Sequence, residues 1–405
     1  MTVSVDQPPV GLLSSVTAAL QAGVLRFVDG LTRGRAWRAK VLLFSVALAY
    51  FMAFPSVDVI RSSEFDRTWL ALQRQFDAPL EPHVYEPQSH EAKTALRLTV
   101  PVFAHVVGMG HRGALLLQIV SGVLVLWLAL DVAFVITGDR AIAALCAIGM
   151  ATTFPGVAAF ADDYRGLFDG IAYALLLVAM RTRSAPIVAA CVFLAAYTDE
   201  RALFSSVLLV IWWWLRSEPS GGEATVTRRS GREWPAMVAI AGAWLAYAVS
   251  RQWLVLETGL STPVGGAADV GVNTFIAQIN GLPFGAWSAL ETLWVPVIGA
   301  IAVLVVLGRW VAAAVFALAI AVVLVAANSV TDVTRSAAYV FPAFFVALVV
   351  LRQSDGIARL RTLMAACATL AVLVPTYYTG MNEIRWFLPA PLQFVRMLFY
   401  SRSAS

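Results

Sequence analysis

Long apolar stretches recur through this 405-residue chain from about residue 41 to residue 377, and they constrain its fold more than any other feature. About 20 apolar residues in a helix cross a bilayer, and a helix satisfies its own backbone polar groups there. Charged residues make up only 13% of the chain, about half the share in soluble domains. The alternating pattern of a membrane β-barrel is absent. The sequence therefore predicts an all-α fold, a polytopic membrane helical bundle.

The two ends of the chain differ from this apolar middle. Residues 1–40 are predicted to form a cytoplasmic amphipathic segment, because apolar residues over 10–38 recur at helical spacing and basic residues crowd their end. Residues 41–377 form the transmembrane domain, and residues 378–405 an interfacial C-terminal segment that is rich in aromatics over 384–400. The net charge of +4 comes without a basic patch interleaved with aromatics, so no nucleic-acid partner is expected.

Two ambiguous stretches decide the topology. Residues 98–110 are apolar but short, since 13 residues make only about 20 Å of helix. One helix through 185–216 would place Asp199, Glu200 and Arg201 near the middle of the membrane, which is costly. If 98–110 does not cross and 185–216 is two helices, the arginine-rich loop 216–234 and the 359–361 tract fall on the cytoplasmic side.

This solution predicts about eleven spans. They lie at about 41–56, 113–136, 140–158, 165–181, 185–198, 201–216, 235–255, 288–307, 309–327, 336–352 and 359–377. The first loop and three clusters of charged residues then share the non-cytoplasmic side. Charges beside apolar helices are usually paired or functional, so these clusters are the candidate site.

The first cluster comprises Asp162, Asp163 and Arg165, with Asp169 predicted one or two turns inside the apolar region. The helix dipole stabilises acidic residues at a helix start, and Arg165 and Asp169 can pair because they are four residues apart. A purely structural role is therefore one interpretation. The functional interpretation is an acidic ligand set for a metal or a hydroxylated acceptor, with Arg165 for a phosphate.

The other two clusters are Asp199-Glu200-Arg201 and Asp332 with Arg335. A hairpin turn usually recruits Gly, Pro or Asn, and the first of these clusters has none. Thr198 and Thr334 are predicted to cap the helices that follow. An arginine at a helix start also suits a phosphate, since its fork binds two oxygens.

The first loop supplies both bases and cations. His90, Lys93 and Arg97 fall near one helical face, just before the apolar stretch 98–110, where an anionic lipid head would sit. A loop carboxylate can take the proton of an acceptor hydroxyl as general base. The spacing leaves the choice among Asp58, Glu64 and Asp66 open.

Several short motifs resemble the GT-C superfamily of integral-membrane glycosyltransferases. They are Ser63 to Trp69 in the first loop, the Arg97-Leu98-Thr99-Val100-Pro101 run, Asp162-Asp163 with the Asp169 helix, Thr198-Asp199-Glu200-Arg201, and Asp332-x-x-Arg335 before Phe341-Pro342. The similarity covers roughly residues 41–352. Asp199 stands where relatives usually carry a lysine.

The resemblance implies membrane-parallel helices in the first outer loop and transfer of a sugar from a polyprenyl-phosphate donor to a glycan, lipid or protein acceptor at the plasma membrane. The base would be Asp66 or Glu64, and a divalent metal is optional. The arginines implied to bind the donor phosphate are Arg97, Arg165, Arg201 and Arg335.

Two other classes compete with this assignment. A transporter or flippase of an anionic lipid-linked or sugar substrate would use the same arginines, and it predicts discontinuous helices at the bilayer midplane. A membrane acyltransferase would need a histidine deep in a channel, whereas the four histidines cluster between residues 83 and 111.

Overall fold

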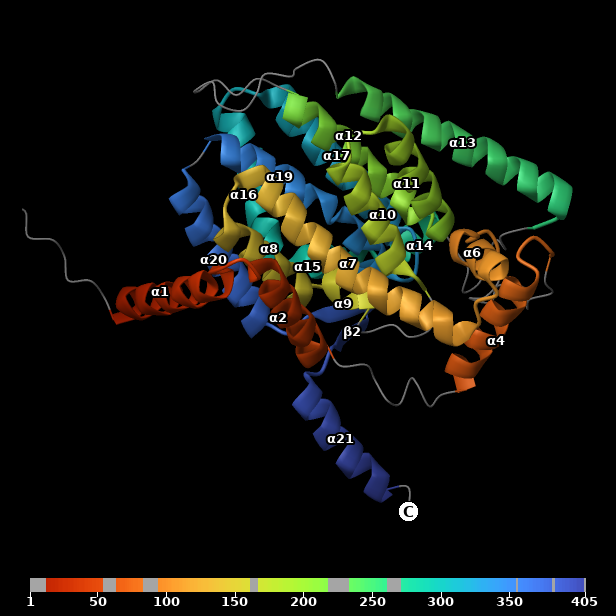
Figure 1. Cartoon of the computed structure of the whole chain (residues 1–405), viewed down its shortest axis with the longest axis horizontal. Helices are drawn as coiled ribbons and strands as arrows, with labels where there is room; N and C mark the ends of the chain where they lie inside the picture. Colours follow the sequence, from red (N-terminus) through yellow and green to blue (C-terminus); the bar gives the residue numbers. More distant parts are fainter. Residues whose placement is uncertain are drawn as a thin grey trace, which may run out of the picture.

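The computed structural model describes residues 12–53, 63–82, 94–160, 167–217, 233–260, 271–354, 356–380 and 383–403. These residues form helices almost throughout, with one two-stranded antiparallel hairpin near the C-terminus (Figure 1). The all-α bundle is thus confirmed, and the length and composition of its apolar helices fit a membrane protein. By length and composition, four described helical segments can cross a membrane by themselves: His111–Thr137, Ile279–Val306, Trp310–Asn328 and Val333–Ser354. The larger count of about eleven spans stays a prediction.

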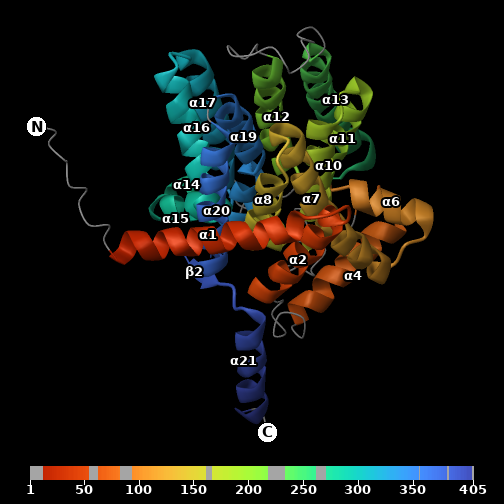
Figure 2. The ribbon, with the colours of Figure 1, turned by 60° about the vertical axis from the view of Figure 1, so that its left-hand side comes forward.

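The first third of the chain places two helices outside the main bundle. The elements are α1 (Leu12–Thr32), α2 (Trp37–Met52), α4 (Ser63–Asp77), α6 (Thr99–Val107), α7 (His111–Thr137), α8 (Arg140–Thr152) and α9 (Phe154–Phe160). Helix α6 has only nine residues, about 14 Å of helix, and packs beside α4 at one side of the bundle (Figure 2). The prediction that 98–110 is too short to cross is consistent with this length.

The middle of the chain contains the predicted break. The elements are α10 (Asp169–Arg181), α11 (Ala185–Thr198), α12 (Arg201–Ser217), α13 (Trp234–Thr258), α14 (Val272–Ala277), η2 (Ile279–Gly281) and α15 (Leu282–Leu290). Residues 185–216 are two helices, and Asp199 and Glu200 separate them, as the cost of charges in mid-membrane predicts.

The last third contains both continuous helices and helices divided by short 3-10 segments. The elements are η3 (Glu291–Leu293), α16 (Trp294–Val306), α17 (Trp310–Asn328), α18 (Val333–Ala337), η4 (Ala338–Val340), α19 (Pro342–Ser354), α20 (Ile357–Leu373), β1 (Tyr377–Gly380), β2 (Glu383–Trp386) and α21 (Ala390–Ser403). The predicted interfacial stretch 384–400 therefore begins as a strand and continues as α21, which projects away from the bundle (Figure 1).

Two helices form the centre of the bundle. Helix α8 is buried from Ala141 to Thr152, and α19 from Pro342 to Leu351, and neither stretch contains a charged residue. Helix α8 packs against α2, α7 and α20, while α19 packs against α7, α12 and α16. Small side chains in α8 let these neighbours approach closely, which is how membrane helices associate without a hydrophobic driving force between them.

One end of the bundle is rich in basic residues. Asp131 of α7 pairs with Arg38 at the start of α2 and with Arg181 at the end of α10. A third ion pair, between Asp139 and Arg361, links the starts of α8 and α20. We call this the basic end, because arginines and lysines that lie there include Arg33, Arg35, Lys40, Arg140, Arg183, Arg216 and Arg359. Helix α1 crosses the bundle here, horizontal in Figure 2 while α12, α13 and α17 stand upright behind it.

Candidate functional site

The described residues of the charged clusters converge at the other end of the bundle. Side chains from four separate segments meet there in one ion-pair network, most of it buried. Its members are Arg97, Asp169, Asp199, Glu200, Arg201, Asp332 and Arg335. Sequence separation within the network reaches 166 residues, so the fold rather than any local motif builds it.

Asp169 is the first residue of α10, not one or two turns inside the helix as predicted. Its carboxylate accepts hydrogen bonds from Arg335 Nε at 2.5 Å, Tyr339 Oη at 2.8 Å and Arg201 Nη2 at 3.2 Å. The expected partner Arg165 lies outside the described residues. Asp169 therefore joins α10 to α12 and α18, three segments that are distant in sequence.

The backbone around Asp169 is built for close packing. A Cβ at Gly170 would lie 2.2 Å from the carbonyl oxygen of Ala159, so only glycine lets α9 approach this point. Phe168, just before Asp169, has a φ of +58°, a left-handed conformation that is strained for a residue with a side chain. Such strain concentrates at functional sites.

Asp199 is the centre of the network and is fully buried. It pairs with Arg201 through both oxygens, at 2.6 and 2.5 Å, and with Arg97 Nη1 at 2.8 Å. Burial alone would raise the pKa of the Asp199 carboxyl, but the guanidinium groups of Arg201 and Arg97 outweigh it and hold that pKa well below its usual range. Asp199 also caps α12, because its Oδ1 accepts from the Arg201 backbone N–H at 3.0 Å.

Both predicted threonine caps are wrong. The Thr198 hydroxyl donates backward to the Leu194 carbonyl, and Asp199 takes the capping role. The Thr334 hydroxyl lies 2.7 Å from Ser288 Oγ and accepts from the Thr379 backbone N–H, so it ties α18 to α15 and β1 instead. Thr198 thus bonds within its own helix, whereas the buried Thr334 hydroxyl has tertiary partners that sequence spacing does not show.

Arg335 and Asp332 form the predicted i,i+3 pair, at 3.1 Å. The Arg335 side chain is buried, and its Nε donates a hydrogen bond to the Asp169 carboxylate. Its Nη2 has no hydrogen-bond acceptor among the described residues, and Asp199 Oδ2 lies 3.6 Å away. Arg335 and Arg201 thus hold the network together and are enclosed by it, so neither is placed to meet a ligand directly in this conformation.

Arg97 is the arginine at the edge of the network. It precedes α6, its side chain is 16% exposed, and it forms a two-pronged pair with Glu200 at 3.2 Å for both bonds. The other candidates of the first loop divide into two groups: Asp58, His90 and Lys93 lie outside the described residues, and Glu64 and Asp66 belong to α4. Asp162 and Asp163 also lie outside the described part of the chain.

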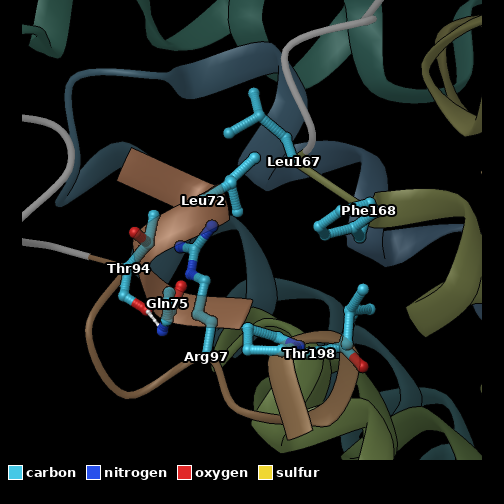
Figure 3. A pocket seen from close by; sticks show the side chains of 9 residues that line it. Leu72, Gln75, Thr94, Arg97, Leu167, Phe168 and Thr198 are labelled. Atoms are coloured by element: carbon cyan, nitrogen blue, oxygen red, sulfur yellow. Dashed lines mark hydrogen bonds between the residues drawn. The ribbon is translucent and has the colours of Figure 1, made fainter. Parts of the chain in front are cut away.

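A hollow lies beside Arg97. It is small, with a cavity volume of about 20 Å³, and its lining is mainly apolar: Leu72, Val100, Pro101, Leu167 and Phe168, with Gln75, Thr94, Arg97 and Thr198. Figure 3 shows the Arg97 side chain reaching into this space, with Leu72 and Gln75 of α4 near it and Phe168 across from them. A cation at the edge of an apolar hollow suits an amphipathic anion.

One buried carboxyl was not found from the sequence. Glu291 sits at the break between α15 and α16, is 2% exposed and has a φ of +50°. Neither of its oxygens has a well-formed hydrogen bond among the described residues, although the Thr376 hydroxyl is nearby. Glu291 could have been identified from the sequence because it falls within the predicted span 288–307, and ionisable residues within spans are functional candidates.

No protein-family model matches this chain, and no curated protein or solved structure matches it either. Within the described residues, no group of three or more His, Cys, Asp or Glu side chains is arranged to hold a metal ion. The function of the site is therefore inferred from its geometry.

Proposed function

We propose that the chain is a membrane glycosyltransferase that moves a sugar from a polyprenyl-phosphate donor to an acceptor on the non-cytoplasmic side. The observation that carries this proposal is Arg97, a partly exposed guanidinium between a buried ion network and an apolar hollow. The guanidinium fork matches a phosphate, and the apolar lining has the polarity of an isoprene chain, for which the small hollow must widen when the donor binds.

The proposed reaction uses one base and one arginine. A carboxylate of α4 takes the proton of the acceptor hydroxyl, and the hydroxyl oxygen attacks the anomeric carbon of the sugar. The bond from that carbon to the phosphate oxygen breaks, and its electron pair leaves with the polyprenyl phosphate. Arg97 stabilises the charge that develops on this phosphate. Asp199 and Arg201 are positioning residues that hold Arg97 in place.

The charge pattern supports an orientation for this site. Cytoplasmic ends of membrane helices carry an excess of Lys and Arg, so the basic end is assigned to the cytoplasm and the network to the opposite side. Both ends offer exposed positions for labelling: Arg35 and Arg359 at the basic end, Glu257 and Glu383 at the other.

Single cysteine substitutions at these four positions will react with a membrane-impermeant maleimide in two groups. The variants Arg35→Cys and Arg359→Cys require permeabilised cells, whereas Glu257→Cys and Glu383→Cys react in intact cells. The natural cysteines are all buried, which keeps the background low. Labelling of positions 35 and 257 from the same side contradicts the topology.

Transfer from a defined donor tests the function. Purified protein in nanodiscs is expected to transfer sugar from a polyprenyl-phosphate donor to an acceptor, and Arg97→Gln to lower the rate about 100-fold, the typical loss when one charge-stabilising donor is removed. Arg97→Lys keeps the charge and should retain part of the rate. Full activity in Arg97→Gln would remove this arginine from the mechanism.

A transporter is the second candidate, and Glu291 favours it. Transporters place binding sites where membrane helices are broken, and Glu291 is a buried carboxyl at such a break between α15 and α16. If Glu291 binds a coupling ion, Glu291→Gln abolishes movement of substrate across liposomes while variants of the α4 carboxylates remain active. The glycosyltransferase proposal predicts the reverse pattern.

A further inference from the structure

The three described arginines of the network differ in whether they can give up a carboxylate partner to bind a ligand. Arg201 gives Nε and Nη2 to aspartates and Nη1 to Ser336, and its guanidinium lies 5.0 Å from the Tyr339 ring centre. Arg335 is bound to Asp169 and Asp332 in the same enclosed region. Separating Arg201 from Asp199, or Arg335 from Asp169, would leave buried charges without their main partners, which costs several kcal/mol.

Arg97 pairs with one buried and one half-exposed carboxylate. Its Nη1 holds the fully buried Asp199 at 2.8 Å, while Nε and Nη2 hold Glu200, whose side chain is 42% exposed. A half-exposed carboxylate regains water when it leaves, so this pair is weak compared with a buried one. The Glu200 carboxylate also occupies the two-pronged face of Arg97, the face that a phosphate would use.

The charges of the network limit what can replace Glu200. Three arginines face four carboxylates in the network, a formal balance of −1 for these residues. Without Glu200, three arginines face three aspartates. An incoming anion with a single negative charge would restore the original balance, whereas a doubly charged phosphate monoester would exceed it.

We propose that Glu200 is the anion that the substrate displaces from Arg97, and that the site selects a singly charged phosphodiester over a phosphate monoester. The inference rests on the proposed function and names the chemical class of its donor: a sugar linked through phosphate to a lipid chain is such a diester. The product of sugar transfer is a monoester, so the return of Glu200 to Arg97 favours its release.

Binding to the full-length protein in nanodiscs tests this exchange. The probes are geranyl methyl phosphate as the lipid diester, geranyl phosphate as the monoester, and dimethyl phosphate as a diester without a lipid chain. Wild type should prefer the lipid diester over both others. Glu200→Gln should bind that diester about two- to fivefold more tightly, the size expected when a half-exposed competing ion pair is removed, and should lose part of its preference over the monoester.

The controls separate two kinds of failure. Glu383→Gln, which removes an exposed carboxylate paired with Arg385 in the hairpin, should leave binding unchanged. Arg97→Lys, which keeps the charge beside Asp199, should weaken binding of the diester more than about tenfold if the fork is what binds. Weaker or unchanged binding by Glu200→Gln, with binding still dependent on Arg97, overturns the exchange alone. Absence of binding of any probe to wild type overturns the proposed function as well.

Discussion

Replacing Asp199 with alanine will destabilise the protein by about 3–5 kcal/mol, because it removes the carboxylate that neutralises Arg201 and Arg97 in a buried site. The loss is expected to be larger than that of any surface ion pair, since exposed pairs contribute about 1 kcal/mol or less. Asp199→Asn keeps the size of the side chain but not its charge, and it should lose most of the same stability.

The matched control is Asp332→Asn. Asp332 also pairs with an arginine of the network, at 3.1 Å, but its side chain is 28% exposed. Water can replace it, so the expected loss is below about 1 kcal/mol. Reversible unfolding in a detergent–SDS titration, followed by the fluorescence of the 13 tryptophans, measures both variants. Equal losses for Asp199→Asn and Asp332→Asn would show that burial does not decide the strength of these pairs.

The same pair predicts how stability depends on pH. The folded protein lowers the pKa of Asp199 below the value of about 3.9 that an unfolded aspartate has. The folded state therefore binds fewer protons than the unfolded state in this range, and the stabilisation is complete above about pH 5. It declines as the pH falls below about 4 toward the lowered pKa, and Asp199→Asn should lose this part of the acid sensitivity.

Removing the general base is expected to give the largest effect on activity. General base catalysis contributes about 10²- to 10⁴-fold, so the variant that lacks the base should lose this much of the transfer rate without unfolding. The candidates on α4 are Glu64 and Asp66. Position 64 is eight and eleven residues before Leu72 and Gln75, so at 3.6 residues per turn we expect it on the same side of α4 as these two lining residues.

Position 66 falls on the opposite face by the same count, so Glu64→Gln should lose more activity than Asp66→Asn. Asp77→Asn is the control on the same helix, because Asp77 is exposed at its last position, where it accepts a hydrogen bond from Gln73. Transfer rates from the polyprenyl-phosphate donor, with melting temperatures for each variant, make the measurement. Full activity in both Glu64→Gln and Asp66→Asn would move the base away from α4.

The sequence by itself determined the class of fold and where its helices are interrupted. Apolar length predicts helices in a bilayer, and the cost of charge in hydrocarbon predicts the break at Asp199 and Glu200. It also predicts the local Asp332–Arg335 pair, because residues three apart on a helix are neighbours whatever the rest of the chain does.

Only the tertiary structure decided what the charges do. Asp169 pairs with Arg201 and Arg335, 32 and 166 residues away, partners that its local spacing does not indicate. Thr334 bonds to Ser288 and Thr379 rather than capping a helix, and Glu291 lies buried at a helix break. A buried charge is stabilised by whichever opposite charge the packing brings within about 3 Å, and helix packing, unlike helix formation, is not encoded in local spacing.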